Sequence, residues 1–296
     1  MTSNIYGNLI AQFDRIFRHN RQGSFKTKER YGKAMKRFCR FLAERYRLEK
    51  LANIAPKHVF AYVDFMKGKG LSASTIKTEL SAIRFWHDMM PNARHTLPDN
   101  SEISLERRSF GRIDRTWTNA EFHKMMCVCL EHNREDYLTA LCLARYAGLR
   151  IHECFRIDTA TAANAVKAME ITIKGKGGKV RTVPINESIK IMLEKRLAVT
   201  ERGRKLLVPE GVLTHRAINN LEQFICAHRH EVQEPDALHQ LTFHGLRHTY
   251  AQEQYLNLLK SGGTRLEAER GVSRLLGHER PEVTRIYLAG LEAQDV

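Results

Sequence analysis

Apolar residues recur every three to four positions in the first hundred residues, and this spacing predicts a small bundle of helices. Residues 26–47 carry the clearest apolar stripe, formed by Tyr31, Met35, Phe38, Leu42 and Tyr46. A second helix is expected to begin after Pro56 and to end at Gly68, and a third to be capped near Ser74. Residues 1–98 are therefore expected to form one helical domain.

Other patterns interrupt the helical spacing in the rest of the chain. Residues 99–115 are polar and lack a sustained period, which predicts a linker. Residues 169–186 alternate apolar and polar positions on both sides of a glycine-rich turn, as is typical of a β-hairpin. The alanine-rich stretch 158–170 is expected to be irregular. Helical patterns fill most of the remainder: a capping box at Thr118 and Glu121, then 135–147, 187–198, 214–230, 244–260, 266–276 and 282–290.

These elements predict a mainly α protein of two domains. A basic helical domain (residues 1–98) is joined by the linker to a second domain (residues 116–296), which is mixed α/β because it contains the small hairpin. The chain of 296 residues is long enough for two separate apolar cores.

The charge of the chain points to a polyanionic partner. The sequence has 48 Lys and Arg against 33 Asp and Glu, a net charge of +15, and 19 of the basic but only 8 of the acidic residues lie in residues 1–100. A solvated helix face is the alternative, but so many like charges repel one another without counter-ions or phosphates. The expected DNA contacts are Lys26, Lys28, Lys33, Lys36, Arg37, Lys77 and Arg84 in the first domain, and Lys174, Lys179 and Arg181 on the hairpin.

Cysteine usage and the N-terminus favour the cytoplasm. The six cysteines form no CxxC pair and mostly lie in apolar helical patterns, so we expect reduced thiols in the core. The first residues lack the apolar stretch of a signal peptide, and no apolar run approaches the roughly 20 residues that a membrane helix needs.

Short motifs in the second domain carry the candidate chemistry. They are AGLRIHE at 147–153, GKGGK at 175–179, HGLRH at 244–248, LGH at 276–278, and Tyr287. In this order they resemble the tyrosine recombinase (phage integrase) family, whose members carry Arg, Lys, His-x-x-Arg, His or Trp, and Tyr in the same sequence. The matching positions are Arg150, Lys176, His244, Arg247, His278 and Tyr287. The resemblance covers residues 117–290, and the basic bundle before them resembles the family's core-binding domain.

The two arginines of these motifs suit a phosphodiester. Displacement at phosphorus builds charge on the non-bridging oxygens, and guanidinium groups match that geometry with paired hydrogen bonds. Arg150 and Arg247 are the expected pair; for each, a structural arginine is the alternative. Glu153, three residues after Arg150, is expected to lie on the same helix face and to orient that arginine.

The resemblance also assigns the remaining roles. Tyr287 would attack phosphorus, His244 would accept the phenol proton, and His278 would donate a hydrogen bond to the phosphate. Lys176, at the tip of the hairpin, would protonate the leaving 5′ oxygen, although Lys174 and Lys179 are close enough to replace it and all three could contact phosphates instead. We expect Tyr287 to act within its own protomer.

No cofactor is expected. The run GKGGK lacks the spacing of a P-loop and precedes a strand instead of a helix. His244 and His248 are spaced as a metal pair, but no acidic or cysteine partner lies beside them and Arg247 would repel a cation. ATP is not needed because a phosphotyrosyl bond conserves the energy of the ester.

The sequence thus predicts a site-specific recombinase or integrase that cleaves and rejoins DNA through a 3′-phosphotyrosyl intermediate. Its expected partners are double-stranded DNA with a specific recombination site, further copies of the chain in a synaptic tetramer, and an accessory DNA-bending or directionality protein. The resemblance implies a bacterial or phage-encoded enzyme at the nucleoid. A type IB-like topoisomerase and a catalytically silent DNA-binding regulator are the alternatives.

Overall fold

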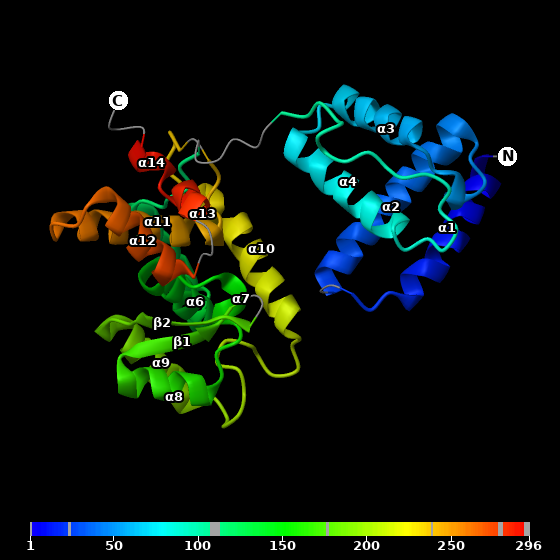
Figure 1. Cartoon of the computed structure of the whole chain (residues 1–296). Helices are drawn as coiled ribbons and strands as arrows, with labels where there is room; N and C mark the ends of the chain where they lie inside the picture. The colour runs from blue at the N-terminus through cyan, green and yellow to red at the C-terminus, as the bar shows by residue number, and fades with distance from the viewer. Residues whose placement is uncertain are drawn as a thin grey trace. The chain divides into compact units, whose positions relative to one another are not determined.

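The computed structural model describes residues 2–22, 25–106, 113–175, 178–237, 239–277 and 281–292. The chain divides into two compact units, Met1–Arg108 and Ser109–Val296 (Figure 1). Most described residues are helical, and the strands form one small antiparallel sheet in the second unit. The predicted fold class, mainly α with a β-hairpin, is confirmed. None of the helices in these ranges is long and apolar enough to cross a membrane.

The first unit is a helical bundle around an apolar core. Its helices are α1 (Thr2–His19), α2 (Phe25–Tyr46), α3 (Pro56–Gly68) and α4 (Ala73–His87), with a short 3-10 helix at Leu51–Asn53. The predicted stripe of α2 is largely buried, since Met35, Phe38 and Leu42 are fully buried. Trp86 of α4 contacts Phe13 of α1 edge to face, with ring centroids 5.1 Å apart.

Two local expectations for this unit were wrong or incomplete. The helix α1 was not predicted, although Leu9 and Phe13 are spaced on one face and are both fully buried. The cap of α4 is Ser72 and not Ser74, because the Ser72 hydroxyl accepts a hydrogen bond from the Thr75 amide at 3.3 Å.

The beginning of the expected linker packs on the bundle. Ile103 is buried in the core of the first unit. The ammonium of Lys77 donates to the carbonyl of Glu106 at 2.7 Å. Residues 107–112 lie outside the described ranges, and Asp114 belongs to the second unit, where it accepts a hydrogen bond from Gln252 at 3.2 Å.

In the second unit, α11 is a central helix that other helices pack against. Its helices are α5 (Asn119–Glu131), α6 (Glu135–Ala147), α7 (Ile151–Cys154), α8 (Thr159–Ala168), α9 (Glu187–Val199), α10 (Thr214–Val232), α11 (Phe243–Lys260), α12 (Arg265–Leu276), α13 (Pro281–Tyr287) and α14 (Ala289–Glu292). The helix α11 packs against α6, α12 and α13, and its first two turns are almost entirely buried. The chain therefore places the HGLRH motif at the start of a core helix.

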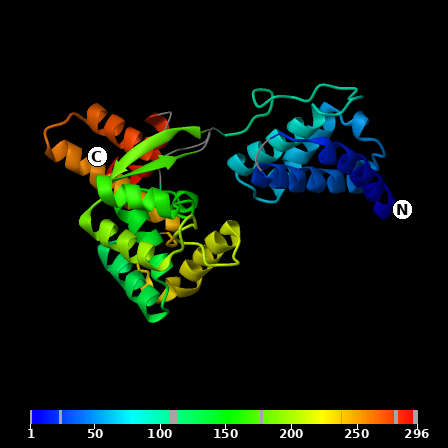
Figure 2. The ribbon, with the colours of Figure 1, turned by 90° about the horizontal axis from the view of Figure 1, so that it is seen from below.

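The hairpin consists of β1 (Glu170–Lys174) and β2 (Val180–Pro184), paired antiparallel. The strand β1 packs against α8 and β2 packs against α12, so the hairpin joins two helical layers (Figure 2). Ile171 and Val183 face each other in register and are fully buried, while Thr172 and Thr182 face outward with their hydroxyls 3.2 Å apart. The predicted alternation of the two strands is confirmed.

Two expectations for the second unit were wrong. The alanine-rich stretch is not irregular but forms α8, which Asp158 caps by accepting a hydrogen bond from the Thr161 amide at 2.8 Å. The small side chains of Ala162 and Ala165 let this helix lie close to the core. The expected last helix is two helices, α13 ending at Tyr287 and α14 beginning at Ala289.

Four of the six cysteines, Cys39, Cys129, Cys142 and Cys154, are buried, as expected of core thiols, whereas Cys127 and Cys226 are exposed.

Candidate active site

Four of the predicted catalytic residues, Arg150, His244, Arg247 and Tyr287, come together in the second unit. The ring centroids of His244 and Tyr287 lie 5.3 Å apart, and the Arg247 guanidinium carbon lies 5.7 Å from the Tyr287 ring centroid. The charge of Arg150 is close enough to lower the pKa of His244. The other two, Lys176 and His278, lie outside the described residues.

The start of α11 sets the place of His244. The Trp117 indole donates to the carbonyl of Thr242 at 2.9 Å, just before the helix begins. A Cβ atom at Gly245 would lie less than 3.0 Å from the carbonyl oxygen of Arg115 and from the Trp117 ring. Only glycine allows this close crossing, so the end of the linker locks the turn that carries His244.

Arg150 lies at the N-cap of α7, just after α6 ends at Gly148 with φ +61°. Its backbone amide and its Nη1 donate to the two carboxylate oxygens of Glu153, at 2.8 and 3.0 Å. We expected the two residues on one face of a helix. Instead, Arg150 lies just before the first turn of α7, and Glu153 in that turn accepts hydrogen bonds from it. The contact that would orient Arg150 is present, and 28% of the Arg150 side chain stays exposed.

Glu153 is held ionised inside the protein. Its side chain is fully buried, and burial by itself raises the pKa of a carboxyl. Hydrogen bonds from Arg181 and from the Arg150 amide, with the two guanidinium charges, lower the pKa of Glu153 to about 2.

Arg181 is placed differently from the DNA contact that we expected. Its side chain is only 10% exposed, and its Nη1 and Nη2 donate to Glu153 at 2.9 and 2.7 Å. Its Nε donates to the carbonyl of Leu275 at 3.1 Å. The buried carboxylate requires a counter-ion, and Arg181 supplies it instead of facing solvent.

Arg247 is fully buried and ties two segments of the site together. Its Nη1 donates to the carbonyl of Gly148, and its Nη2 donates to the carbonyl of Leu276 at 2.6 Å. Burial lowers the pKa of Arg247 to about 10, while the neighbouring Tyr287 phenol opposes that shift. The guanidinium therefore remains charged at neutral pH beside the tyrosine.

Two histidines next to Tyr287 are held neutral. Desolvation and the charges of Arg247, Arg150 and Arg115 lower the pKa of His244 to about 4. The His248 ring stacks on the Tyr287 ring, and burial with the neighbouring His244 and Arg115 lowers its pKa to about 3. His248 was absent from the expected site. Its four-residue spacing from His244 was interpreted only as a metal pair, and no group of three or more potential metal ligands occurs among the described residues.

Tyr287 ends α13 and faces the interior of its own unit. Only 6% of the residue is exposed, and Gln252 of α11 donates to its carbonyl oxygen at 3.4 Å. The same Gln252 amide donates to Asp114, so the end of α13 is connected to the residues that follow the linker.

The expected DNA contacts of the first unit form two groups. Lys33, Lys36 and Arg37 are exposed along α2, where Arg37 also pairs with Glu79. Other side chains are partly buried and donate to backbone carbonyls: Lys28 to Asn20 at 2.8 Å, Lys77 to Glu106 at 2.7 Å and Arg84 to Pro98 at 2.7 Å. The Lys26 side chain lies outside the described residues. On the hairpin, Lys174 and Lys179 are exposed.

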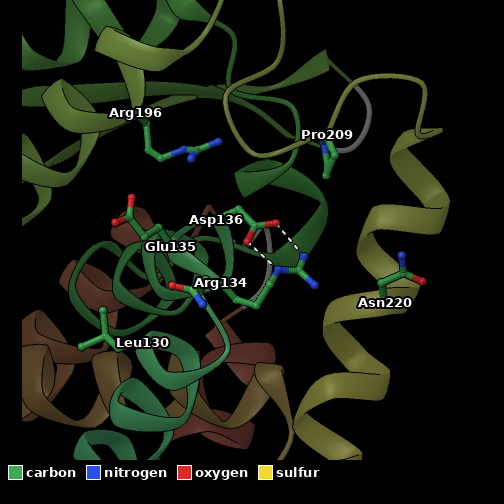
Figure 3. A pocket seen from close by; sticks show the side chains of 8 residues that line it. Leu130, Arg134, Glu135, Asp136, Arg196, Pro209 and Asn220 are labelled. Atoms are coloured by element: carbon green, nitrogen blue, oxygen red, sulfur yellow. Dashed lines mark hydrogen bonds and ion pairs between the residues drawn. The ribbon is translucent and has the colours of Figure 1, made fainter.

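Two cavities in the second unit differ in their relation to this site. One of about 380 Å³ opens beside the cluster, with Arg150 and His244 in its lining. Another, of about 570 Å³, shares no residue with the cluster (Figure 3). In it, Arg134 pairs with Asp136 at 2.7 and 3.0 Å and lies over the Tyr137 ring, so the charge of Arg134 is paired within the protein.

Family models and individual relatives of similar sequence all belong to the phage integrases and tyrosine recombinases. The model of the phage integrase family matches residues 115–293, and the model of the phage integrase N-terminal SAM-like domain matches residues 10–90. Tyrosine recombinase XerC of Herpetosiphon aurantiacus is 26% identical over 263 residues, which are 87% of this chain and 82% of that protein. Tyrosine recombinase XerD of Rickettsia conorii is 23% identical over 296 residues, 94% of this chain and 93% of that protein.

Solved structures share the fold at low sequence identity. A lambda integrase dimer bound to a COC′ core site has a TM-score of 0.67 and 16% identity, covering 97% of this chain and 79% of that one. The XerH site-specific recombinase bound to a palindromic difH substrate, in a post-cleavage complex, has a TM-score of 0.64 and 17% identity, covering 96% of this chain and 82% of that one.

Proposed function

Because the chain belongs to the phage integrase family, we propose that it is a site-specific recombinase in which Tyr287 cleaves DNA strands and rejoins them. The observation that carries the proposal is the position of Tyr287, which packs against the charged guanidinium of Arg247 and the neutral imidazole of His244 in one chain. A nucleophile, cations for a phosphate and a proton acceptor are thus within a few ångströms of one another.

The first step is a displacement at phosphorus. Arg150, whose side chain is partly exposed, holds the non-bridging oxygens, and the positive charge of the buried Arg247 stabilises them. The Tyr287 oxygen forms a bond to phosphorus, and the bond from phosphorus to the 5′ oxygen breaks. The phenol proton passes to His244, and Lys176 supplies a proton to the leaving 5′ oxygen. His278 donates a hydrogen bond to the phosphate. The product is a 3′-phosphotyrosyl linkage, and a 5′ hydroxyl of another strand reverses the step.

In the absence of DNA, the charges of three arginines help to lower the pKa of His244. A bound phosphodiester adds a negative charge beside Arg150 and Arg247 and offsets their effect on the imidazole. We therefore expect DNA binding to raise the pKa of His244 and to make it a better proton acceptor when the substrate is in place.

The substrate in this proposal is duplex DNA with a specific site, bound by several copies of the chain. The net charge of +15 and the exposed Lys33 and Lys36 on α2 support DNA binding. The integrase compared above is a dimer on DNA, and we propose a synaptic tetramer for this chain. An accessory DNA-bending or directionality protein and a place at the bacterial nucleoid complete the proposal.

A nicked suicide substrate tests the chemistry, because it traps the covalent intermediate. The wild-type chain is expected to form a DNA adduct that survives denaturation, and Tyr287→Phe to form none. Tyr146→Phe is the matched control, since this partly exposed tyrosine of α6 lies outside the site, and it is expected to react like wild type. An adduct that persists in Tyr287→Phe would refute the assignment of the nucleophile.

A plasmid that carries two copies of the site separates recombination from relaxation. A recombinase yields deletion or inversion products, whereas a type IB-like topoisomerase relaxes the plasmid without either. Binding without any covalent adduct would instead identify a DNA-binding regulator.

A further inference from the structure

We propose that Arg181 is a positioning residue that links the β-hairpin to Arg150 and to the C-terminal end of α12. The inference rests on the recombinase function proposed above, because it concerns how the groups of the same site are held. Arg181 does not touch the substrate in this proposal. It acts through Glu153 and through the backbone of α12.

One carboxylate serves two arginines. Arg181 donates to both oxygens of Glu153, at 2.9 and 2.7 Å, and Arg150 donates to the same two oxygens through Nη1 and its backbone amide. The Glu153 side chain is fully buried and Arg181 is 10% exposed, whereas Arg150 reaches the surface of the site. If Arg181 is removed, Arg150 becomes the remaining charged partner of a buried carboxylate and is drawn toward it.

The second contact holds the end of α12. The last carbonyls of a helix lack partners within the helix and carry partial negative charge. Arg181 Nε donates to the carbonyl of Leu275 at 3.1 Å, and Arg247 Nη2 donates to the next carbonyl, of Leu276, at 2.6 Å. Gly277 ends the helix with φ +65°, one position before His278 in the sequence.

The alternation of β2 aims Arg181 inward. It lies two residues from Val183, which is fully buried, so both side chains are on the inner face of the strand, opposite Thr182. Its partner in register is Ile173, also buried. The hairpin is thus linked to Arg150, through Glu153, by a side chain of its own second strand.

A positioning role and a DNA contact differ in their response to salt. The slope of log K against log salt is negative, and each phosphate contact that is lost lowers its magnitude, the salt slope, by about 0.9 for duplex DNA. We expect Arg181→Gln to leave the salt slope unchanged, because the guanidinium is buried and donates to protein atoms. The matched comparison is Lys179→Gln, two residues earlier on the exposed part of the hairpin, which is expected to lower the salt slope. A lower salt slope for Arg181→Gln would overturn the proposal.

Cleavage at saturating DNA measures the effect on the site. Arg181→Gln is expected to slow formation of the Tyr287 adduct about a hundredfold, as small displacements of catalytic groups do. Arg181→Lys is expected to be intermediate, since an ammonium cannot make the paired contact with Glu153. Arg204→Gln, which removes an exposed arginine paired with Glu210, is the control and should react like wild type.

A double variant tests whether Arg181 acts through Glu153. Glu153→Gln keeps an acceptor but removes the charge. If the two residues act as one group, the double variant should be no slower than the slower single variant. If the factors by which the two single substitutions slow cleavage multiply in the double variant, Arg181 acts independently of Glu153 and the proposal is contradicted.

Amide hydrogen exchange tests the positioning role of Arg181 without depending on DNA cleavage. Arg181→Gln is expected to speed amide exchange in residues 170–184, 148–154 and 272–277 together, with the rest of the second unit unchanged. If wild type forms no adduct but these three segments loosen together, the proposed function fails and the positioning role stands. If only the hairpin loosens, Arg181 does not join the segments and the inference is wrong.

Discussion

The His248 ring lies on the Tyr287 ring, with centroids 4.4 Å apart and planes inclined by 28°. This stack supports the tyrosine ring, and the His248 ring in turn lies 5.2 Å from the His244 ring. The two histidines come from successive turns of α11 and the tyrosine from the end of α13. The position of the Tyr287 hydroxyl therefore depends on a contact between two helices and not on α13 alone.

Loss of this stack should slow cleavage without abolishing it. We expect His248→Ala to reduce the rate of adduct formation on a suicide substrate by up to about tenfold, since an aromatic pair contributes about 0.5–1.5 kcal/mol. His248→Phe keeps the ring and should lose less. Equal rates for His248→Ala and wild type would show that the stack does not position Tyr287.

Gly245→Ala should destabilise the second unit. The added methyl group meets the Arg115 carbonyl and the Trp117 ring at under 3.0 Å, so the start of α11 has to move, at a cost of about 1–3 kcal/mol. Calorimetric unfolding measures this change, and adduct formation should fall as His244 shifts.

Gly7→Ala is the control for that substitution. Gly7 lies within α1 and has nothing within 4 Å of the added Cβ, so this change should stabilise the first unit by about 0.5–1 kcal/mol. A Gly245→Ala protein as stable as wild type would mean that the linker end does not lock α11.

The stability of the second unit should rise with pH between about 4 and 6.5. Burial, then His244 and Arg115, lower the pKa of His248 to about 3, and Arg247 also lowers it while Asp114 opposes the shift. Below the unfolded pKa of about 6.5 the unfolded chain binds protons that the folded chain does not, so stability falls as pH falls. His152 and His244 have lowered pKa values and act in the same direction.

Replacement of His248 by Asn should flatten this pH dependence. The variant binds one proton fewer on unfolding, so the slope of its free energy of unfolding against pH should decrease by about 1.4 kcal/mol per pH unit. Glu153→Gln is the control: the pKa of Glu153 is lowered to about 2, so its contribution is lost only as pH falls below about 4.5. Unfolding in denaturant at pH 5 and 6.5 distinguishes the two, and an unchanged slope in His248→Asn would exclude a neutral buried His248.

Charge removal on α2 should weaken DNA binding in a salt-dependent way. The exposed Lys33 and Lys36 make only surface ion pairs, with Glu29 at 2.7 Å and Asp14 at 3.8 Å, so both ammonium groups are available to phosphates. We expect Lys33→Gln with Lys36→Gln to lower the magnitude of the negative slope of log K against log salt by about 1.8. Lys195→Gln, an exposed lysine on α9, is the control and should leave the slope unchanged. If the double variant keeps the wild-type slope, α2 does not contact the DNA backbone.

Local periodicity predicted most elements of the fold. The stripe of α2, the capping box at Thr118 and the alternation around the glycine turn each depend on residues within a few positions, and each is present in the structure. The pattern was weakest in α8, because alanine gives little contrast between a buried and an exposed face. The helix α1 has the required spacing, but for its segment the sequence prediction was limited to the absence of a signal peptide.

The sequence by itself determined which residue types are available to the site: the order of the motifs predicted that Arg150, His244, Arg247 and Tyr287 belong together, and the structure brings them together. Only the tertiary structure decided what Arg181 and His248 contact. Arg181 finds Glu153 and Leu275, 28 and 94 residues away, and His248 meets a tyrosine on another helix. In the sequence a buried arginine and a phosphate-binding arginine look alike, because burial and counter-ion are properties of packing between distant segments.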